Sequence, residues 1–330
     1  MTSALLAVSC TARPDVSALP PLRLRAPGAL LASILPGYAL SADLATACPL
    51  VEGAGRLLAV VVDNDPRARP QSGLSQACLI YEVPTEAKIP RLLAVFSNGA
   101  PSRVGPVRSV RPSFLQLGAE LGAVVAHSGG SLEAFRDIRR YGFAVINELW
   151  TAGPFWRVRD RHMPHNLYGS VPRLREAMAR GGYDRPPARP QPEVMTYAEP
   201  EGPDAAEVEI AYPPGFGVRF AYQDGAYVRH VVGREHRDAL TGAPIRVRAV
   251  IVQFVRWHGW REGRVDVSRV DLVGTGRALV FAEGRVTEAT WRKADLRAQT
   301  AFRDPQGRGL LLAGPVWLAL VPVGTPVTVR

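Results

Sequence analysis

The sequence predicts an α+β fold, with an N-terminal α/β domain built on a mixed sheet and a mostly antiparallel β domain after it. Up to residue 183, continuous apolar runs alternate with amphipathic helical segments, whereas beyond residue 204 the apolar residues recur at every second position and helix signals are nearly absent. A proline-rich stretch separates the two patterns. We therefore expect a signal and tether region at 1–48, the α/β domain at 49–183, a linker at 184–204 and the β domain at 205–330.

In the N-terminal part, the apolar runs predict strands at 57–62, 77–83, 91–97, 121–127 and 143–146. Helical periodicity predicts helices at 112–121, 131–141 and 171–180, and Ser131 is expected to cap the second of them. Because 121–127 is apolar throughout, we expect that strand at the centre of the sheet. Residues 150–170 are expected to form one long loop whose aromatic residues pin it to the core.

In the C-terminal part, GVRFAYQDGAYVRHVVG predicts a hairpin that turns at Asp224-Gly225. Further strands are expected at 247–255, 265–273, 277–281, 284–291 and 316–321, with Trp291 and Trp317 as packing residues. Short strands joined by turns predict a small sandwich or barrel.

Composition narrows the class of protein. A chain of 330 residues that is 47% hydrophobic can bury a sizeable core. Of the 40 basic residues all but Lys88 and Lys293 are arginine, and they are spread along the chain without a basic helix or arm. We interpret the net charge of +10 as an arginine-biased surface rather than a nucleic-acid interface.

The N-terminus resembles the end of a lipoprotein signal peptide. Residues 4–10 (ALLAVSC) resemble a lipobox with Cys10 as the acylated residue, although Ala7 stands where leucine is usual and the charged region that precedes a lipobox is missing. We expect the gene product to start upstream and residues 11–47 to act as a tether; the alternative is that Cys10 is accidental. Cys78 lies in a strand-like run and is expected to be a buried small residue, with a Cys48–Cys78 disulfide as the alternative.

The candidate site is organised around RVGPVRSVRP, in which Arg108 and Arg111 are three residues apart beside a helix start. Guanidinium groups there suit a carboxylate or phosphate, or they pair with acidic residues inside the fold. We expect Arg108, Arg111, His127 and the 157–166 loop to line one cleft at the end of strand 121–127. The full predicted ligand-binding set is Asp63, Asn64, Arg69, Glu82, Arg91, Arg108, Arg111, His127, Ser128, Trp156, Arg157, His165 and Asn166.

Two kinds of chemistry are considered for this site, nucleophilic catalysis and metal binding. Ser128 could act as a nucleophile, but the adjacent His127 points to the opposite face of a strand and no G-x-S-x-G motif is present. His162 and His165 could bind a metal with His127, but they lie in a loop rather than on one helical face. The sequence therefore predicts no metal and no cofactor, and binding rather than catalysis.

The chain resembles the YerB-like lipoproteins, a bacterial family whose shared region has no settled activity. The motifs that carry the resemblance run in order over about 48–322, among them VVDNDPRARPQSGLSQA, GPVRSVRP, HSGGSLEA, PHNLYGS, DLVGTGRALVFAEGRVTEATWRK and GPVWLALVP. The resemblance implies a cell-envelope lipoprotein outside the cytoplasm, anchored in the membrane through Cys10.

We expect the protein to bind an anionic or polar ligand (a glycan, a peptide or a small molecule), with a cell-wall component or a protein as its partner. The alternatives are an envelope hydrolase or transferase that uses the same cleft, and an interaction scaffold without a small ligand.

Overall fold

The computed structural model describes residues 56–97, 101–185, 197–198, 201–262, 264–310 and 315–330. Cys10, the tether and most of the expected linker lie outside the described residues.

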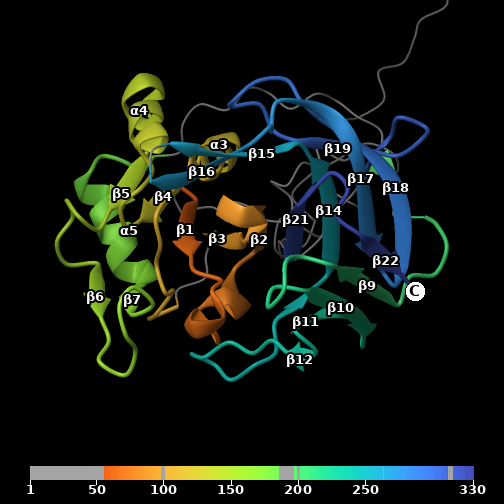
Figure 1. The fold of residues 1–330 in the computed structure, drawn as a ribbon, viewed down its shortest axis with the longest axis horizontal. Coiled ribbons are helices and arrows are strands. Elements are labelled where there is room, and N and C mark those ends of the chain that lie inside the picture. The colour runs from red at the N-terminus through yellow and green to blue at the C-terminus, as the bar shows by residue number, and fades with distance from the viewer. Residues whose placement is uncertain (1–55, 98–100, 186–196, 199–200, 263, 311–314) are drawn as a thin grey trace, which may run out of the picture.

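One large mixed sheet runs through both parts of the chain (Figure 1). Its twelve strands have the order β5-β4-β1-β3-β2-β21-β14-β17-β18-β19-β20-β8. Their bounds are β1 Leu58–Val62, β2 Leu79–Pro84, β3 Pro90–Phe96, β4 Val124–His127, β5 Val145–Asn147, β8 Tyr197–Ala198, β14 Ala249–Val255, β17 Gly274–Ala282, β18 Arg285–Lys293, β19 Ala301–Arg303, β20 Gly309–Leu310 and β21 Val316–Pro322.

The N- and C-terminal parts are joined at the pair β2 and β21. These strands are parallel, with Leu79 opposite Val316 and Glu82 opposite Ala319, and every residue of both strands is buried. Strands covered on both faces read as continuous apolar runs, which is the pattern of both segments. The α+β class is confirmed, but the C-terminal strands do not form a sandwich of their own, because several extend the N-terminal sheet. The boundaries of the linker remain a prediction.

A second sheet lies below the first in Figure 1 and has the order β12-β11-β10-β9-β22, with β13 paired to β11. The Asp224-Gly225 hairpin is confirmed as β10 and β11, and both turn residues have positive φ, 49° and 73°. Two separate hairpins are β6–β7 and β15–β16. The bounds of these strands are β6 Phe155–Arg157, β7 Leu167–Gly169, β9 Glu207–Ile210, β10 Val218–Gln223, β11 Ala226–Val231, β12 Arg234–Glu235, β13 Arg246–Val247, β15 Trp257–Glu262, β16 Val265–Val270 and β22 Val327–Val329.

Helices cover both faces of the N-terminal part of the large sheet. Helices α3 (Pro112–Glu120) and α4 (Leu132–Tyr141) pack on one face, and α5 (Val171–Arg180) packs on the other together with the second sheet. Ser131 caps α4 as predicted, since its hydroxyl accepts from the backbone N–H of Ala134. Three short 3₁₀ turns are η2 Pro66–Ala68, η3 Leu74–Gln76 and η4 Glu86–Lys88. No helix in the described part of the chain is long and apolar enough to span a membrane.

Three expectations about these elements were wrong. Strand β4 is not central: only β5 lies beyond it at that edge, and its apolar character comes from the helices that cover both faces. The 150–170 segment is not one loop, because it contains the β6–β7 hairpin. Cys78 is half-buried and disulfide-bonded rather than a buried small residue, and the chain's other two cysteines lie outside the described residues.

Candidate polar site at the sheet edge

Three parallel strands end at the same edge of the large sheet. Strand β4 pairs in parallel with β1 on one side and with β5 on the other. The first residues beyond these strands are polar: Asp63 after β1, Ser128 after β4 and Glu148 after β5. In α/β sheets, the carboxyl ends of parallel strands are the usual place for a ligand.

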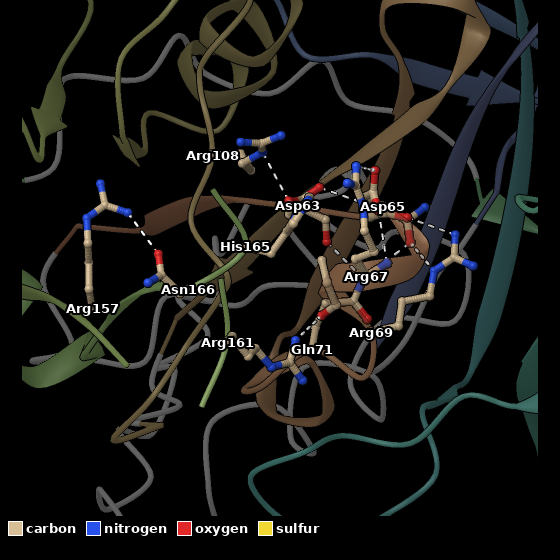
Figure 2. Close-up of polar contacts among 12 residues, drawn as sticks. Asp63, Asp65, Arg67, Arg69, Gln71, Arg108, Arg157, Arg161, His165 and Asn166 are labelled. Atoms are coloured by element: carbon tan, nitrogen blue, oxygen red, sulfur yellow. Dashed lines mark hydrogen bonds and ion pairs between the residues drawn. The ribbon is translucent and has the colours of Figure 1, made fainter. Parts of the chain in front are cut away.

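Asp63 is the centre of one half of this site. Its Oδ2 lies 2.7 Å from Nδ1 of His165 and 3.0 Å from Nε of Arg108, and its Oδ1 accepts from the backbone N–H of Asp65 at 3.0 Å. Figure 2 shows Arg108 and His165 converging on Asp63 from different segments. The Arg108 contact is an ion pair without hydrogen-bond alignment, since its Nε–H finds no acceptor. In the neutral imidazole, Nδ1 of His165 donates to Asp63, and the buried Nε2 is left with no partner in the described part of the chain.

Arg157 and Glu148 form the other half. Arg157 donates from Nη1 to Oδ1 of Asn166 at 3.0 Å, and its Nη2 lies 3.8 Å from Oε1 of Glu148. The hydroxyl of Ser128 donates to the other oxygen of Glu148 at 2.9 Å, and the backbone N–H of Ser128 donates to the carbonyl of Arg108 at 3.0 Å. Because His165 and Asn166 are neighbours in the chain, these contacts close into a circle, which we call the polar ring: Asp63, Arg108, Ser128, Glu148, Arg157, His165 and Asn166.

A buried turn positions the ring. Oδ1 of Asn147 accepts from the backbone N–H groups of Gly129 and Leu149, at 3.1 and 3.2 Å. Gly129 has a φ of 64°, a conformation that glycine adopts without strain, and its carbonyl accepts from Nδ1 of His127 at 2.8 Å. His127 is fully buried, and this burial lowers its pKa to about 4. His127 therefore supports the turn from below as a neutral imidazole and does not line the ring.

Two of the predicted arginines have partners within the protein, outside the polar ring. Arg111 holds Glu86 through both carboxylate oxygens, at 2.6 and 3.1 Å. Burial alone would raise the pKa of Glu86, but the Arg111 guanidinium lowers it below its ordinary value. Arg91 donates to the carbonyl of Ser109 at 2.8 Å, and burial lowers its pKa to about 10. For Arg111 the internal pairing left open by the sequence is the one observed, so we leave both arginines out of the ring.

Trp156 is also outside the ring. It neighbours Arg157 on β6, and successive side chains of a strand point to opposite faces. The guanidinium of Arg173 lies 5.9 Å from its ring centroid.

Three further predicted residues belong to a second polar group, deep between the two parts of the chain. Glu82 accepts from Arg229 and from Nε1 of Trp317, both at 2.8 Å, and the side chains of Glu82 and Arg229 are 0% exposed. Asn64 joins this group because it accepts from Arg69 and from Gln71, both at 3.2 Å. We call this set the buried cluster: Asn64, Arg69, Gln71, Glu82, Arg229, His236 and Trp317.

The buried cluster continues through His236 without a gap. Nη1 of Arg229 lies 2.8 Å from Nδ1 of His236, whose Nε2 lies 2.7 Å from Oε1 of Gln71. Burial first, and the charges of Arg229 and Arg69 next, lower the pKa of His236 well below its ordinary value, so the ring accepts from Arg229 and donates to Gln71. This cluster joins the two parts of the chain, and all of its side chains except the half-buried Arg69 are buried.

Sequence reasoning missed Glu148, which completes the polar ring. Its signal was its position directly after a strand, the same position as Asp63 and Ser128. The three-residue strand β5 is too short for a clear alternating pattern, so the position was not recognised.

The described residues also bear on two other kinds of site, metal centres and cavities. Within the described ranges, no group of three His, Cys, Asp or Glu residues is arranged to hold a metal. Two surface cavities of about 680 and 900 Å³ lie over C-terminal strands, and neither is lined by a residue of the polar ring.

Comparison with known proteins places the chain in a family. Residues 46–184 match the family described as "Protein of unknown function (DUF3048) N-terminal domain", and residues 208–318 match its C-terminal domain. The chain belongs to this family, that of the YerB-like lipoproteins, and the resemblance expected from the sequence is confirmed.

One relative and one solved structure are similar over most of their length. The chain is 32% identical over 276 residues to the "Putative lipoprotein YerB" of Bacillus subtilis (strain 168), which covers 81% of each. It also matches the crystal structure of YerB protein from Bacillus subtilis with a TM-score of 0.71 and 27% identity, over 83% of this chain and 94% of that one. The similarity to a lipoprotein favours a membrane-anchored protein outside the cytoplasm.

Proposed function

We propose that this chain is a cell-envelope lipoprotein that binds a polar ligand at the polar ring. The observation that carries the proposal is a set of ion-paired groups that the fold does not fully enclose. The side chains of Arg108, Glu148 and Arg157 are 25%, 21% and 39% exposed, whereas the Glu82–Arg229 pair is 0% exposed. Charged groups held in place at the carboxyl ends of parallel strands, with part of their surface open, support a binding site.

The charge of the ring defines the ligand more closely. Two arginines face two carboxylates, so the ring is formally neutral apart from His165. An isolated anion would meet Asp63 and Glu148 as well as the arginines. A ligand with both hydrogen-bond donors and acceptors complements the ring better than a bare anion does.

Catalysis at the same ring is the second candidate, and one observation favours it. Asp63 holds His165 through Nδ1 at 2.7 Å, which is how a carboxylate orients a histidine that acts as a general base. Its Nε2 has no partner among the described residues but is buried, so catalysis would require water or substrate to enter beside it. Ser128 is a poor nucleophile in this arrangement, because its hydroxyl proton is directed at Glu148. A hydrolase of this kind would activate water.

Ligand binding is tested by thermal unfolding of the purified chain in the presence of cell-wall fragments, oligosaccharides, short peptides and simple anions. A ligand at about 100 times its dissociation constant stabilises the native state by roughly 2.7 kcal/mol. We expect the shift in Tm to be lost in Arg157→Ala and kept in Arg159→Ala, which changes an exposed arginine two residues away. No shift with any compound, or equal shifts in both variants, would count against the polar ring as a binding site.

The anchor is tested separately. We propose that Cys10 is acylated and that the chain beyond it is exported; the disulfide at Cys78 supports an oxidising compartment. Expression of the chain behind a complete lipoprotein signal peptide should place the protein in the membrane fraction, and Cys10→Ala should release it. A partition that is unchanged in the variant would refute lipidation at this cysteine.

A further inference from the structure

An exposed apolar patch adjoins the polar ring. Leu132, Leu149 and Trp150 are 68%, 62% and 69% exposed, although all three are large apolar side chains. They come from the start of α4 and from the residues directly after Glu148. Apolar side chains grouped at the surface beside polar groups often mark a binding site.

The structure holds Trp150 in place. Its backbone N–H donates to the carbonyl of Asn147 at 3.0 Å, and its ring lies on Phe135 with a centroid distance of 5.6 Å and a tilt of 43°. Phe135 in turn touches Gly130, where an added Cβ would lie 3.4 Å from the Phe135 ring. The Trp150 side chain is therefore supported on one side and open to solvent over most of its surface.

The floor between this patch and the ring is made of backbone. A Cβ on Gly129 would have only Ser109 Oγ and Leu149 Cδ1 nearby, at 3.8 and 3.9 Å, so the glycine leaves open space next to Ser128. Gly130 packs against Val110, with which it forms a β-bridge. The backbone at Gly129 and the side chain of Leu149 therefore lie between Trp150 and Ser128, and they leave room for a flat ligand over the glycine.

We propose that the ligand of the polar ring is a glycan, one sugar of which stacks on Trp150 while its neighbour binds the ring. This inference rests on the proposed function and names the ligand class. The C–H groups on one face of a sugar ring form an apolar surface that fits an exposed indole. Each sugar hydroxyl both donates and accepts, whereas arginines only donate and carboxylates only accept, so hydroxyls match a ring in which the two kinds alternate.

The charges also favour a glycan over an acidic or basic peptide. Arg108 is already paired with Asp63, and Arg157 lies beside Glu148, so a charged ligand group would compete with an existing partner. Neutral hydroxyls can bind such pairs without separating them.

The test is calorimetric titration of the purified full chain with three tetrasaccharides, of N-acetylglucosamine, β-linked glucose and α-linked glucose. A tripeptide of alanine, glutamate and lysine, and acetate, serve as the non-sugar probes. We expect at least one tetrasaccharide to bind saturably, and Trp150→Ala to weaken it by about tenfold or more, the effect of an exposed aromatic hot spot. The matched control is Trp260→Ala, since Trp260 is 43% exposed on the separate β15–β16 hairpin and should change the affinity by less than about twofold. Circular dichroism confirms that each variant is folded.

The outcomes separate this inference from the proposed function. A tetrasaccharide that binds equally well to Trp150→Ala overturns the glycan platform, and so does the absence of saccharide binding. If the tripeptide or acetate binds instead, and Arg157→Ala abolishes that binding, the ring is a binding site for another ligand class and only the glycan inference fails. If no probe binds in a manner that depends on Arg157, both fail.

Discussion

The polar ring and the buried cluster are built from the same side-chain types but differ in what they leave unsatisfied. In the buried cluster, Glu82 has three donors and His236 has a partner at each nitrogen, and the Glu82–Arg229 pair has no exposed surface. In the ring, Nε2 of His165 has no partner within the described ranges, and Arg157 remains 39% exposed. One group of the buried cluster is also unsatisfied. Nε of Arg229 has no acceptor among the described residues, although the Arg229 side chain is fully buried.

This difference separates an arginine with a structural role from one that we propose to bind a ligand. A fully buried arginine that is hydrogen-bonded to two other side chains joins segments of the chain, as Arg229 joins the two parts through Glu82. An arginine paired on one side and open on the other keeps hydrogen-bond donors for a ligand. Within the N-terminal part, Arg111 is 17% exposed and binds Glu86 through both carboxylate oxygens, whereas Arg157 is 39% exposed and its Nη2 lies 3.8 Å from Glu148.

The largest expected effect is on the free energy of unfolding, when glutamate is replaced by glutamine once in the buried cluster and once in the polar ring. Glu82→Gln leaves the buried charge of Arg229 uncompensated and should lower the free energy of unfolding by about 3–5 kcal/mol. Glu148→Gln removes a carboxylate that water can replace and should cost less than about 1 kcal/mol. Denaturant unfolding of the two variants measures both, and equal losses would contradict the division into a structural and a functional group.

The next effect concerns pH and the buried turn beneath the ring. Because the folded pKa of His127 is lowered to about 4, the unfolded chain binds a proton at about pH 6.5 while the folded chain does not. The contribution of His127 to the free energy of unfolding is therefore constant above pH 6.5. It falls as the pH drops towards 4, by up to about 3 kcal/mol from this one group. His127→Gln should flatten the stability profile between pH 6.5 and 4, measured by denaturant unfolding at fixed pH. His162→Gln, at an exposed histidine, is the control and should leave the slope unchanged; equal slopes for wild type and His127→Gln would refute the role of this group.

A smaller effect on stability distinguishes Arg111 from Arg157. Arg111→Ala removes the bidentate contact to Glu86 and should lower stability by about 1.5–3 kcal/mol, the scale of hydrogen bonds to a charged group, without weakening ligand binding. Arg157→Ala should change stability by less than about 1 kcal/mol, because its pair with Glu148 is partly solvated, and should weaken binding. Unfolding curves and titrations of both variants are needed. Loss of binding in a fully folded Arg111→Ala would return this arginine to the site.

The smallest effect is expected at Ser128. Ser128→Ala removes one hydrogen bond to Glu148 and should cost about 1 kcal/mol or less in stability and in ligand affinity. If the protein hydrolyses a substrate and this variant abolishes turnover, Ser128 is a nucleophile and the ring is an active site, contrary to our assignment.

Much of the local structure was predictable because it depends on short-range rules. Apolar runs between turns predicted β1, β2 and β3 within two residues at each end, and Asp224-Gly225 predicted the β10–β11 turn. Ser131 was expected to cap α4 because a hydroxyl before an amphipathic run satisfies a free backbone N–H. The ends of apolar strands also pointed to Asp63 and Ser128, and the long loop at 150–170 pointed to the His165-Asn166 pair, as members of one proposed site.

Only the tertiary structure decided which partner each charged group takes. Arg108 and Arg111 lie three residues apart in equivalent sequence surroundings, yet one faces Asp63 beyond β1 and the other Glu86 in η4. The partners of Glu82 come from β11 and β21, far along the chain, because β2 pairs with β21. Strand order across a sheet depends on long-range packing and is not encoded in the period of any one segment. The sequence by itself therefore determined the elements and the edge at which polar residues gather, and the order of the strands determined which of those residues remain open to a ligand.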